Sequence, residues 1–468
     1  MDTLFSAGIT GKLYRLWFMM NSSAKVKVKT EFGLTQSVDT GENVTQGSIG
    51  GAIVSALNLD KTVTAHFADS DTNVSYGPIL LSPLLYQDDS AKISSSLNHA
   101  QKSNLLMSKT MEMKQLQMNV SKCGTLFFGK KKEVEKIRSE IEESKCLTIN
   151  SNPVPFKITE KYLGDFFHCE GLAKSAETTV NKRFGLALNS VIELKCVIED
   201  FRMHKLGGIN CGLEIFNIAI LPALLYNSET WFEIADTTID RLDRLQLILL
   251  RNLFAVPSST PIPALSWDSG ELSMKHKINE KKLNFIYFLG NLNSSVLAKQ
   301  VYETQKLYNF PGFIPEAKSL LKFYDLPNII DEKHELSKFV WKKRVREAIK
   351  IKYEEELKSR MSNYSKLKGS PLMNENWETR SYIQDMRLED ARTNFRMRCS
   401  MLRTVKMNQK SNEIFARELW ACNQCGKIDS QSHIMWCPAL ASLREGLNID
   451  NDVDVVHYFQ KVISLREA

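Results

Sequence analysis

A short apolar run that ends in two adjacent carboxylates constrains the fold of this chain more than any other feature. The run from Ile79 to Leu85 leads into Tyr86-Gln87-Asp88-Asp89, and Ser90 to Ile93 then resumes an alternating pattern. Extended segments on both sides of a polar pair predict a β-hairpin with a tight turn. We expect the hairpin to begin close to Pro83, because proline has no N–H to donate to the sheet and is therefore confined to the start or edge of a strand.

Two interpretations of the adjacent carboxylates are open at this point. Paired carboxylates at a turn supply the oxygen ligands that Mg²⁺ prefers. An Asp-Asp pair is also common in polar turns that bind nothing, so the tetrapeptide alone is a weak signal. The segments before and after the hairpin decide between the two interpretations.

Length and composition limit the classes of protein to consider. A chain of 468 residues predicts about two to four compact units, and 43% hydrophobic with 25% charged residues is typical of a soluble globular protein. The net charge of +7 is compatible with a nucleic-acid partner. We expect no signal peptide, because no N-terminal segment pairs a basic start with an apolar stretch and a small-residue cleavage site. We expect no membrane span, because the most apolar run, Ile215 to Tyr226, is short and contains Pro222. Mostly scattered cysteines indicate reduced thiols, so we expect a nuclear and cytoplasmic location.

Helical periodicity dominates after residue 170. It predicts helices over about 174–203, 236–254 and 273–292. Three prolines between residues 305 and 332 predict a looser linker. A charge-dense helix is expected from His334 to Arg360, with either a solvated surface or a nucleic-acid contact.

Further motifs lie in a fixed order around the hairpin. Gln46-Gly47-Ser48 feeds a predicted helix before it, and after the next predicted helix, 94–118, Lys122-Cys123 precedes a predicted strand at 125–129. Lys161-Tyr162-Leu163-Gly164 then predicts a further short strand and turn. In this order and spacing the motifs resemble the later palm motifs of reverse transcriptases, most closely those of non-LTR (LINE-like) retrotransposons.

The resemblance implies a two-metal phosphoryl-transfer chemistry with Mg²⁺ ions, acting on an RNA template, a DNA primer or target, and deoxynucleoside triphosphates. It also implies a role for individual residues. Asp88 and Asp89 would be the metal-binding pair, and Tyr86 would lie near the primer end. Gln46 and Gly47 would lie beside the incoming nucleotide, and Lys122 would be a general acid. The primer grip would be formed by Tyr162, Leu163 and Gly164.

A second site is predicted near the C-terminus. Cys422, Cys425, His433 and Cys437 have the spacing C-x2-C-x7-H-x3-C, which is typical of Zn²⁺ ligands. Four protein ligands leave no open position, so this zinc is expected to be structural; the alternative is a chance grouping of reduced thiols. Basic residues precede it and predict a contact with single-stranded RNA or DNA: Arg392, Arg396, Arg398, Arg403 and Lys406. This end of the chain is similar to the Cys-Cys-His-Cys region of the same retrotransposon proteins.

The chain departs from the family in one respect. The family has a further metal-binding Asp on a strand before the segment that matches residues 4–20, and no such strand precedes that segment here. We therefore expect an N-terminally truncated polymerase fragment that is inactive or nearly so. The alternatives are a non-catalytic RNA- or DNA-binding protein that acts through the zinc knuckle and the Arg-rich helix, and a relic without a selected role.

The expected fold class is α+β. We expect a partial polymerase palm at 1–170, a helical thumb-like region at 171–295, a helical linker at 296–375, and a basic helix with a zinc knuckle at 376–468.

Overall fold

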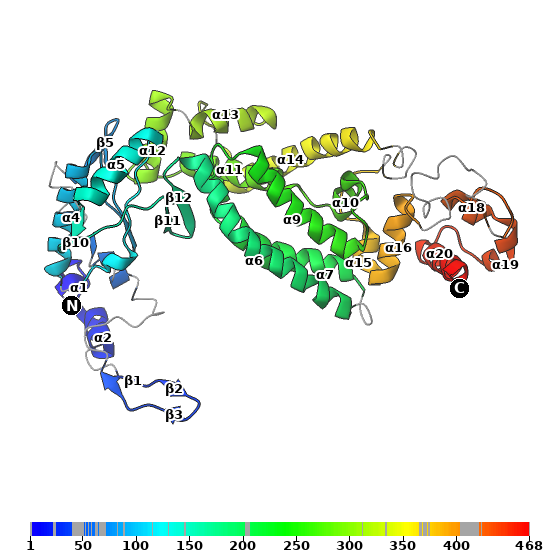
Figure 1. The fold of residues 1–468 in the computed structure, drawn as a ribbon, viewed down its shortest axis with the longest axis horizontal. Coiled ribbons are helices and arrows are strands. Elements are labelled where there is room, and N and C mark those ends of the chain that lie inside the picture. Colours follow the sequence, from blue (N-terminus) through cyan, green and yellow to red (C-terminus); the bar gives the residue numbers. More distant parts are fainter. Residues whose placement is uncertain are drawn as a thin grey trace. The chain divides into compact units, whose positions relative to one another are not determined.

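The structure is a computed structural model, and it is mostly helical with small antiparallel sheets (Figure 1). It describes residues 2–21, 25–39, 51, 53–54, 56–57, 59–60, 64, 72–81, 83–87, 89–114, 116–129, 131–144, 147–201, 206–310, 312–332, 335–364, 367, 372, 375–402, 421–422 and 424–467. The chain divides into two compact units, Met1–Ser175 with Asn293–Asn309, and Ala176–Leu292 with Phe310–Ala468. The predicted boundary at residue 170 lies close to this division, whereas the predicted linker 296–375 is shared between the two units.

The first unit contains the strands. They pair as antiparallel hairpins, β1 with β4, β2 with β3, β5 with β6, β7 with β8, β9 with β10 and β11 with β12. The elements are α1 (Asp2–Ser6), α2 (Gly11–Asn21), β1 (Lys25–Val26), β2 (Lys29–Thr30), β3 (Gly33–Leu34), β4 (Val38–Asp39), β5 (Val74–Tyr76), β6 (Ile79–Leu81), β7 (Leu84–Tyr86), β8 (Asp89–Ala91), α4 (Leu97–Glu112), η2 (Val120–Lys122), α5 (Lys131–Ser144), β9 (Thr148–Ile149), β10 (Asn152–Pro153), β11 (Thr159–Tyr162), β12 (Asp165–His168) and α12 (Leu297–Tyr308).

The second unit is helical. Helix α6 (Leu172–Phe201) begins in the first unit and continues into the second. The remaining elements are α7 (Gly208–Ile215), the π-helical turn η3 (Phe216–Ile220), α8 (Leu221–Leu224), η4 (Ser228–Thr230), α9 (Asp236–Phe254), α10 (Ile262–Ser269), α11 (Met274–Gly290), α13 (Phe313–Phe323), α14 (Lys338–Met361), α15 (Ser381–Asp385), α16 (Leu388–Arg398), α18 (Gln431–Trp436), η8 (Pro438–Leu440), α19 (Ala441–Arg444) and α20 (Asp452–Glu467).

The core of the second unit follows from the helical periodicity of its sequence. Helix α9 has the predicted bounds, and its stripe of leucines is buried, with Leu242 and Leu245 fully enclosed. The aromatic rings of Phe254 and Phe395 lie 4.4 Å apart and join α9 to α16. Helices α11 and α14 pack through Trp341, whose indole N–H donates to the carbonyl oxygen of Leu283 at 3.3 Å.

The prediction of a loose linker at residues 305–332 is wrong for much of its length. Helix α13 occupies 313–323 and buries Ile314 and Leu321 inside the second unit, to which it belongs. Pro315 does not break this helix, because it lies in the first turn, where the backbone N–H groups have no partner within the helix.

The strand predicted at 125–129 is also wrong beyond its first residue. Thr125 forms a single bridge with Phe156, and residues 126–128 have no regular structure. An apolar run of this length does not by itself distinguish a strand from irregular buried chain.

Candidate metal centre and polymerase-like hairpins

The four predicted zinc ligands come together in one cluster. The Sγ atoms of Cys422, Cys425 and Cys437 and a ring nitrogen of His433 lie within 4.8 Å of one another. Cys437 Sγ is 3.9 Å from Cys422 Sγ and 3.6 Å from Cys425 Sγ, and Cys425 Sγ is 3.2 Å from His433 Nε2. Ligands at zinc bond lengths in a tetrahedron are about 3.5–3.8 Å apart. The donor set and its spacing therefore fit one Zn²⁺ ion.

Local backbone geometry places the first two ligands. The N–H groups of Cys425 and Gly426 both donate to the carbonyl oxygen of Cys422, and the N–H of Cys422 donates to the carbonyl oxygen of Lys427. Gly426 has φ +73°, a conformation that favours glycine. The tight turn needed to direct both thiols at one point is therefore encoded in Cys-x2-Cys-Gly.

A short helix places the other two ligands. Ser430 caps α18, its side chain accepting a hydrogen bond from the N–H of His433 at 3.1 Å. Cys437 follows the last helical residue and is fully buried. His433 and Cys437 are thus held at the two ends of one helical turn.

Helix α20, which was not predicted from the sequence, packs against the elements that carry the cluster. Tyr458 and Phe459 of α20 pack with Ile434 of α18 in a small core that also contains Cys422 and Cys437. A guanidinium N–H of Arg444 donates to the carbonyl oxygen of Cys437 at 2.8 Å. The apolar periodicity of residues 452–467 is the signal that could have predicted this helix.

The thiols of the cluster differ in their electrostatics. The backbone N–H of Lys427 lowers the pKa of Cys425, and burial raises the pKa of Cys437. A zinc ion would hold all three thiols as thiolates. With four protein ligands the centre stabilises the local fold and has no open position for a reacting group.

Two of the predicted nucleic-acid contacts on α16, Arg392 and Arg398, are paired with acidic side chains of the second unit. Arg392 is 3% exposed, and its guanidinium donates to Glu199 at 2.7 Å and to the carbonyl oxygen of Leu253 at 2.9 Å. Arg398 donates to the buried Asp268 at 2.9 Å and also pairs with Glu375. These two guanidiniums are held inside the second unit, so a phosphate contact does not fit them in this conformation.

One further predicted basic contact, Arg396, is among the described residues. Arg396 is half-buried and donates to the carbonyl oxygen of Ala255 at 2.8 Å. Arg403 and Lys406 lie outside the described residues.

The predicted carboxylate hairpin is confirmed as a hairpin. Strands β7 and β8 pair Leu84 with Ala91 and Tyr86 with Asp89, which leaves a two-residue turn. Gln87 has φ +56°, as such turns require. Leu85 packs against Met107 and Met111 of α4, whereas Tyr86 is 59% exposed on the opposite face. Asp88 lies outside the described residues.

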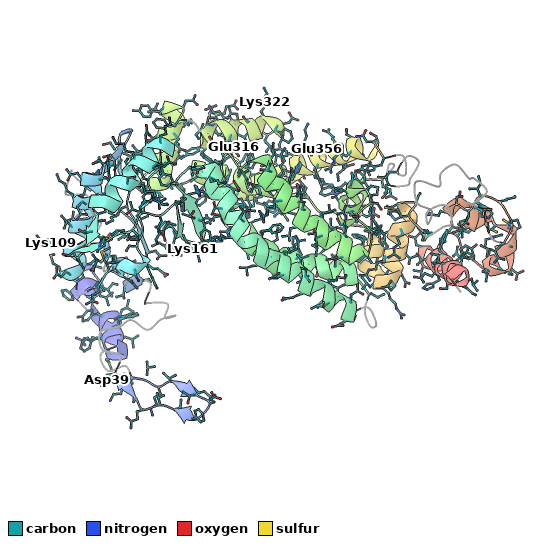
Figure 2. All side chains as sticks on the ribbon, viewed as in Figure 1. Asp39, Lys109, Lys161, Glu316, Lys322 and Glu356 are labelled. Carbon is teal, nitrogen blue, oxygen red and sulfur yellow. The ribbon has the colours of Figure 1, made fainter. Side chains whose placement is uncertain are left out.

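The second predicted turn lies within electrostatic reach of the first. Leu163 and Gly164 have φ +47° and +90° and connect β11 to β12; Lys161 on β11 is labelled in Figure 2. Burial raises the pKa of Tyr162, and the carboxylate of Asp89 raises it further. The structure therefore brings Tyr162 close to Asp89, although the two residues are 73 positions apart in the sequence.

Lys92, which has no predicted role, anchors this hairpin. Lys92 follows β8, and its Nζ donates to Oδ1 of Asn104 on α4 at 2.5 Å. Burial lowers its pKa to about 8. Its position among alternating polar residues gave no signal that its side chain turns inward.

Two other predicted groups are the expected general acid, Lys122, and the expected nucleotide contacts, Gln46 and Gly47. Lys122 is exposed at the end of η2 and makes no ion pair or hydrogen bond with Asp89 in the described part of the chain. Gln46 and Gly47 lie outside the described residues.

Comparison with known proteins adds no family assignment. No family model and no curated protein matches the sequence. Among the described residues, no helix is both long enough and apolar enough to cross a membrane.

Proposed function

We propose that this chain carries the later palm motifs, thumb and C-terminal region of an RNA-directed DNA polymerase of the non-LTR retrotransposon type. The observation that carries the proposal is the two-residue Tyr-Gln-Asp-Asp hairpin with Tyr162 of a second tight hairpin in electrostatic reach of Asp89. The motif order along the sequence supports it, since a hairpin alone is common.

The face on which Tyr86 lies would be the site of the primer end. Leu85 fixes the hairpin on α4 and Lys92 fixes the chain after β8, so Tyr86 and Asp89 belong to a supported element. Tyr162, Leu163 and Gly164 would hold the primer strand from the neighbouring hairpin. Gln46 and Gly47 would contact the incoming nucleotide, and Lys122 would protonate the leaving pyrophosphate.

Asp88 and Asp89 would be the protein's ligands to Mg²⁺, which in such enzymes stabilises the attacking and leaving oxygens. Among the described residues, no group of three or more acidic, His or Cys ligands gathers at Asp89. Mg²⁺ commonly binds through one or two carboxylates together with substrate phosphates. Ion binding at the hairpin would therefore depend on bound nucleic acid.

A second candidate function is non-catalytic binding of RNA or DNA through the zinc knuckle. The geometry of the Cys/His cluster favours it, and Trp436, which lies beside Cys437, is 72% exposed. Exposed aromatic rings stack on unpaired bases in such modules. Because Arg392 and Arg398 point inward, the positive charge would come from Arg396, Arg403 and Lys406.

Fluorescence anisotropy with labelled primer–templates separates the two functions. The polymerase proposal predicts that, in Mg²⁺, the full chain prefers a recessed 3′ end to a blunt duplex of equal length, and that D88A/D89A loses this preference. The knuckle proposal predicts no such preference, with affinity lost in C422S and kept in D88A/D89A. C196S serves as the control, because Cys196 is an exposed cysteine outside the cluster. A wild-type chain without any preference for the recessed end would contradict the polymerase proposal.

A further inference from the structure

Residues 25–39 form a two-stranded ribbon whose every residue is exposed. Strand β1 pairs with β4, with Val26 opposite Val38, and β2 pairs with β3, with Lys29 opposite Leu34. The N–H of Thr35 donates to the carbonyl oxygen of Val28 at 3.0 Å and joins the two paired segments. Figure 1 shows β1, β2 and β3 of this ribbon after α2.

The two faces of the ribbon differ in chemistry. Side chains alternate between the faces of a strand, so Lys25, Lys27 and Lys29 share one face. Each of these lysines is about 6.6 Å from the next along the strand. Val26 lies on the opposite face, beside its cross-strand partner Val38. The result is a row of lysines, with Asp39 opposite Lys25 and Leu34 opposite Lys29, backed by a face that carries the two valines.

The apolar side chains of the ribbon lack the cover that a stable element needs. Phe32 at its turn is 96% exposed, Val38 65% and Val28 58%. An isolated two-stranded hairpin is only marginally stable in water, and grouped exposed apolar residues mark interaction sites. A partner that covers the ribbon would therefore also stabilise it.

Charge identifies the chemistry of that partner. Asp39 lies 3.6 Å from Lys25 at the open end of the ribbon (Figure 2), and Glu31 lies next to Phe32 at the turn. Lys27 and Lys29 make no ion pair with another described residue, so their charge is available. Helix α2, the element before the ribbon, adds two exposed cations, Lys12 and Arg15. A regular row of negative charges, as in a nucleic-acid backbone, complements this row.

We propose that this ribbon binds single-stranded nucleic acid, with Lys27 and Lys29 contacting phosphates and Phe32 stacking on an unpaired base. Stacking on an exposed ring requires a base outside a duplex, which is why a single strand is the ligand. The inference rests on the proposed function, because the natural single strand is then the unpaired part of the template.

The test measures the affinity of the full chain for a fluorescein-labelled 20-nucleotide RNA at several salt concentrations. Each lost phosphate contact lowers the log–log salt slope by about 0.7 on a single strand, so K27Q/K29Q should lower it by about 1.4. F32A should weaken binding by about fivefold or more at constant salt slope, because it removes stacking and no charge. These variants concern exposed side chains, and circular dichroism verifies that they fold.

The matched control is K109Q/K195Q, which removes the same charge from two exposed lysines outside the ribbon. Equal losses in control and ribbon variants would overturn the inference and indicate only a general charge effect. Unchanged binding in the ribbon variants, with the recessed-end preference still dependent on Asp88 and Asp89, would overturn the ribbon inference alone. A wild-type chain that does not bind RNA or DNA would overturn both proposals.

Discussion

The hydroxyl of Tyr458 donates a hydrogen bond of 2.8 Å to the carbonyl oxygen of Ile434. This bond joins α20 to the helical turn between the ligands His433 and Cys437. A segment of ordinary apolar periodicity thus becomes part of the metal centre, although it supplies no ligand.

Tyr458→Phe should destabilise the C-terminal part of the second unit. The substitution keeps the buried ring and leaves the carbonyl of Ile434 without its donor, which costs about 1 kcal/mol. Thermal unfolding of the zinc-loaded chain measures the loss, and Tyr364→Phe, at a tyrosine that is 39% exposed, is the control. Equal stability of the two variants would show that the bond contributes nothing.

Cys422→Ser should abolish stoichiometric zinc binding. The wild-type chain should contain one Zn²⁺ per molecule by atomic emission, because the four donor atoms converge on one point. Cys196→Ser should retain the zinc. A chelator should expose the small core around Cys437 and Phe459 to hydrogen exchange. Purified chains without zinc, but with that core protected, would contradict the structural role.

The pH dependence of stability should include a contribution from His276. Burial lowers its pKa to about 4, and its Nδ1 lies 2.9 Å from Ser273 Oγ in a site enclosed by Tyr324 and Tyr353. The unfolded chain takes up a proton near pH 6.5 and the folded chain only near pH 4. The stability contribution is therefore present above pH 6.5 and is lost as the pH falls from there to about 4.

Urea unfolding at pH 7 and pH 5 measures this contribution. The wild type should lose about 2 kcal/mol more over this interval than His276→Gln, since the shift accounts for roughly 1.4 kcal/mol per pH unit. Both chains are compared with zinc in excess, so that loss of metal in acid is common to them. The same pH dependence in both chains would contradict a neutral, buried His276.

Asp268→Asn should be strongly destabilising. Asp268 is fully buried and accepts hydrogen bonds from Arg398 at 2.9 Å and from Tyr382 at 2.8 Å, with Arg380 3.5 Å away. Removing its charge leaves partly buried guanidiniums with less compensation, which typically costs about 3–5 kcal/mol. Asp240→Asn, at an exposed aspartate of α9, should change the free energy of unfolding little. Equal denaturation midpoints for the two variants would contradict this account of the network.

Local patterns in the sequence predicted local structure well. The hairpin at residues 84–91, the turn at Leu163-Gly164, helix α9 and the convergence of the four Cys/His ligands depend on nearest neighbours and short spacings, and these were predicted. The structure also shows a mostly helical chain with small antiparallel sheets, while the palm itself remains a proposal.

What the sequence could not predict depends on tertiary contacts. Arg392 and Arg398 have the composition of a basic surface, but their partners Glu199, Asp268 and Glu375 lie far away in the chain and draw them inward. Lys92 turns inward because Oδ1 of Asn104 on α4 accepts a hydrogen bond from its ammonium group. The prolines at 311–327 suggested a linker. Pro315 is tolerated because it lies in the first turn of α13, and the residue at which that helix begins could not be read from the sequence.

The position of the primer end tests the central claim most directly. A primer with 4-thiouridine or 4-thiothymidine at its 3′ terminus is annealed to an RNA template, bound to the full chain in Mg²⁺ and irradiated, and the crosslinked peptides are identified by mass spectrometry. The account predicts crosslinks in 84–92 and 159–168, the two hairpins that contain Tyr86 and Tyr162, and their loss when the same nucleotide is moved to the 5′ end. Crosslinks confined to the zinc knuckle, or independent of the position of the nucleotide, would contradict it.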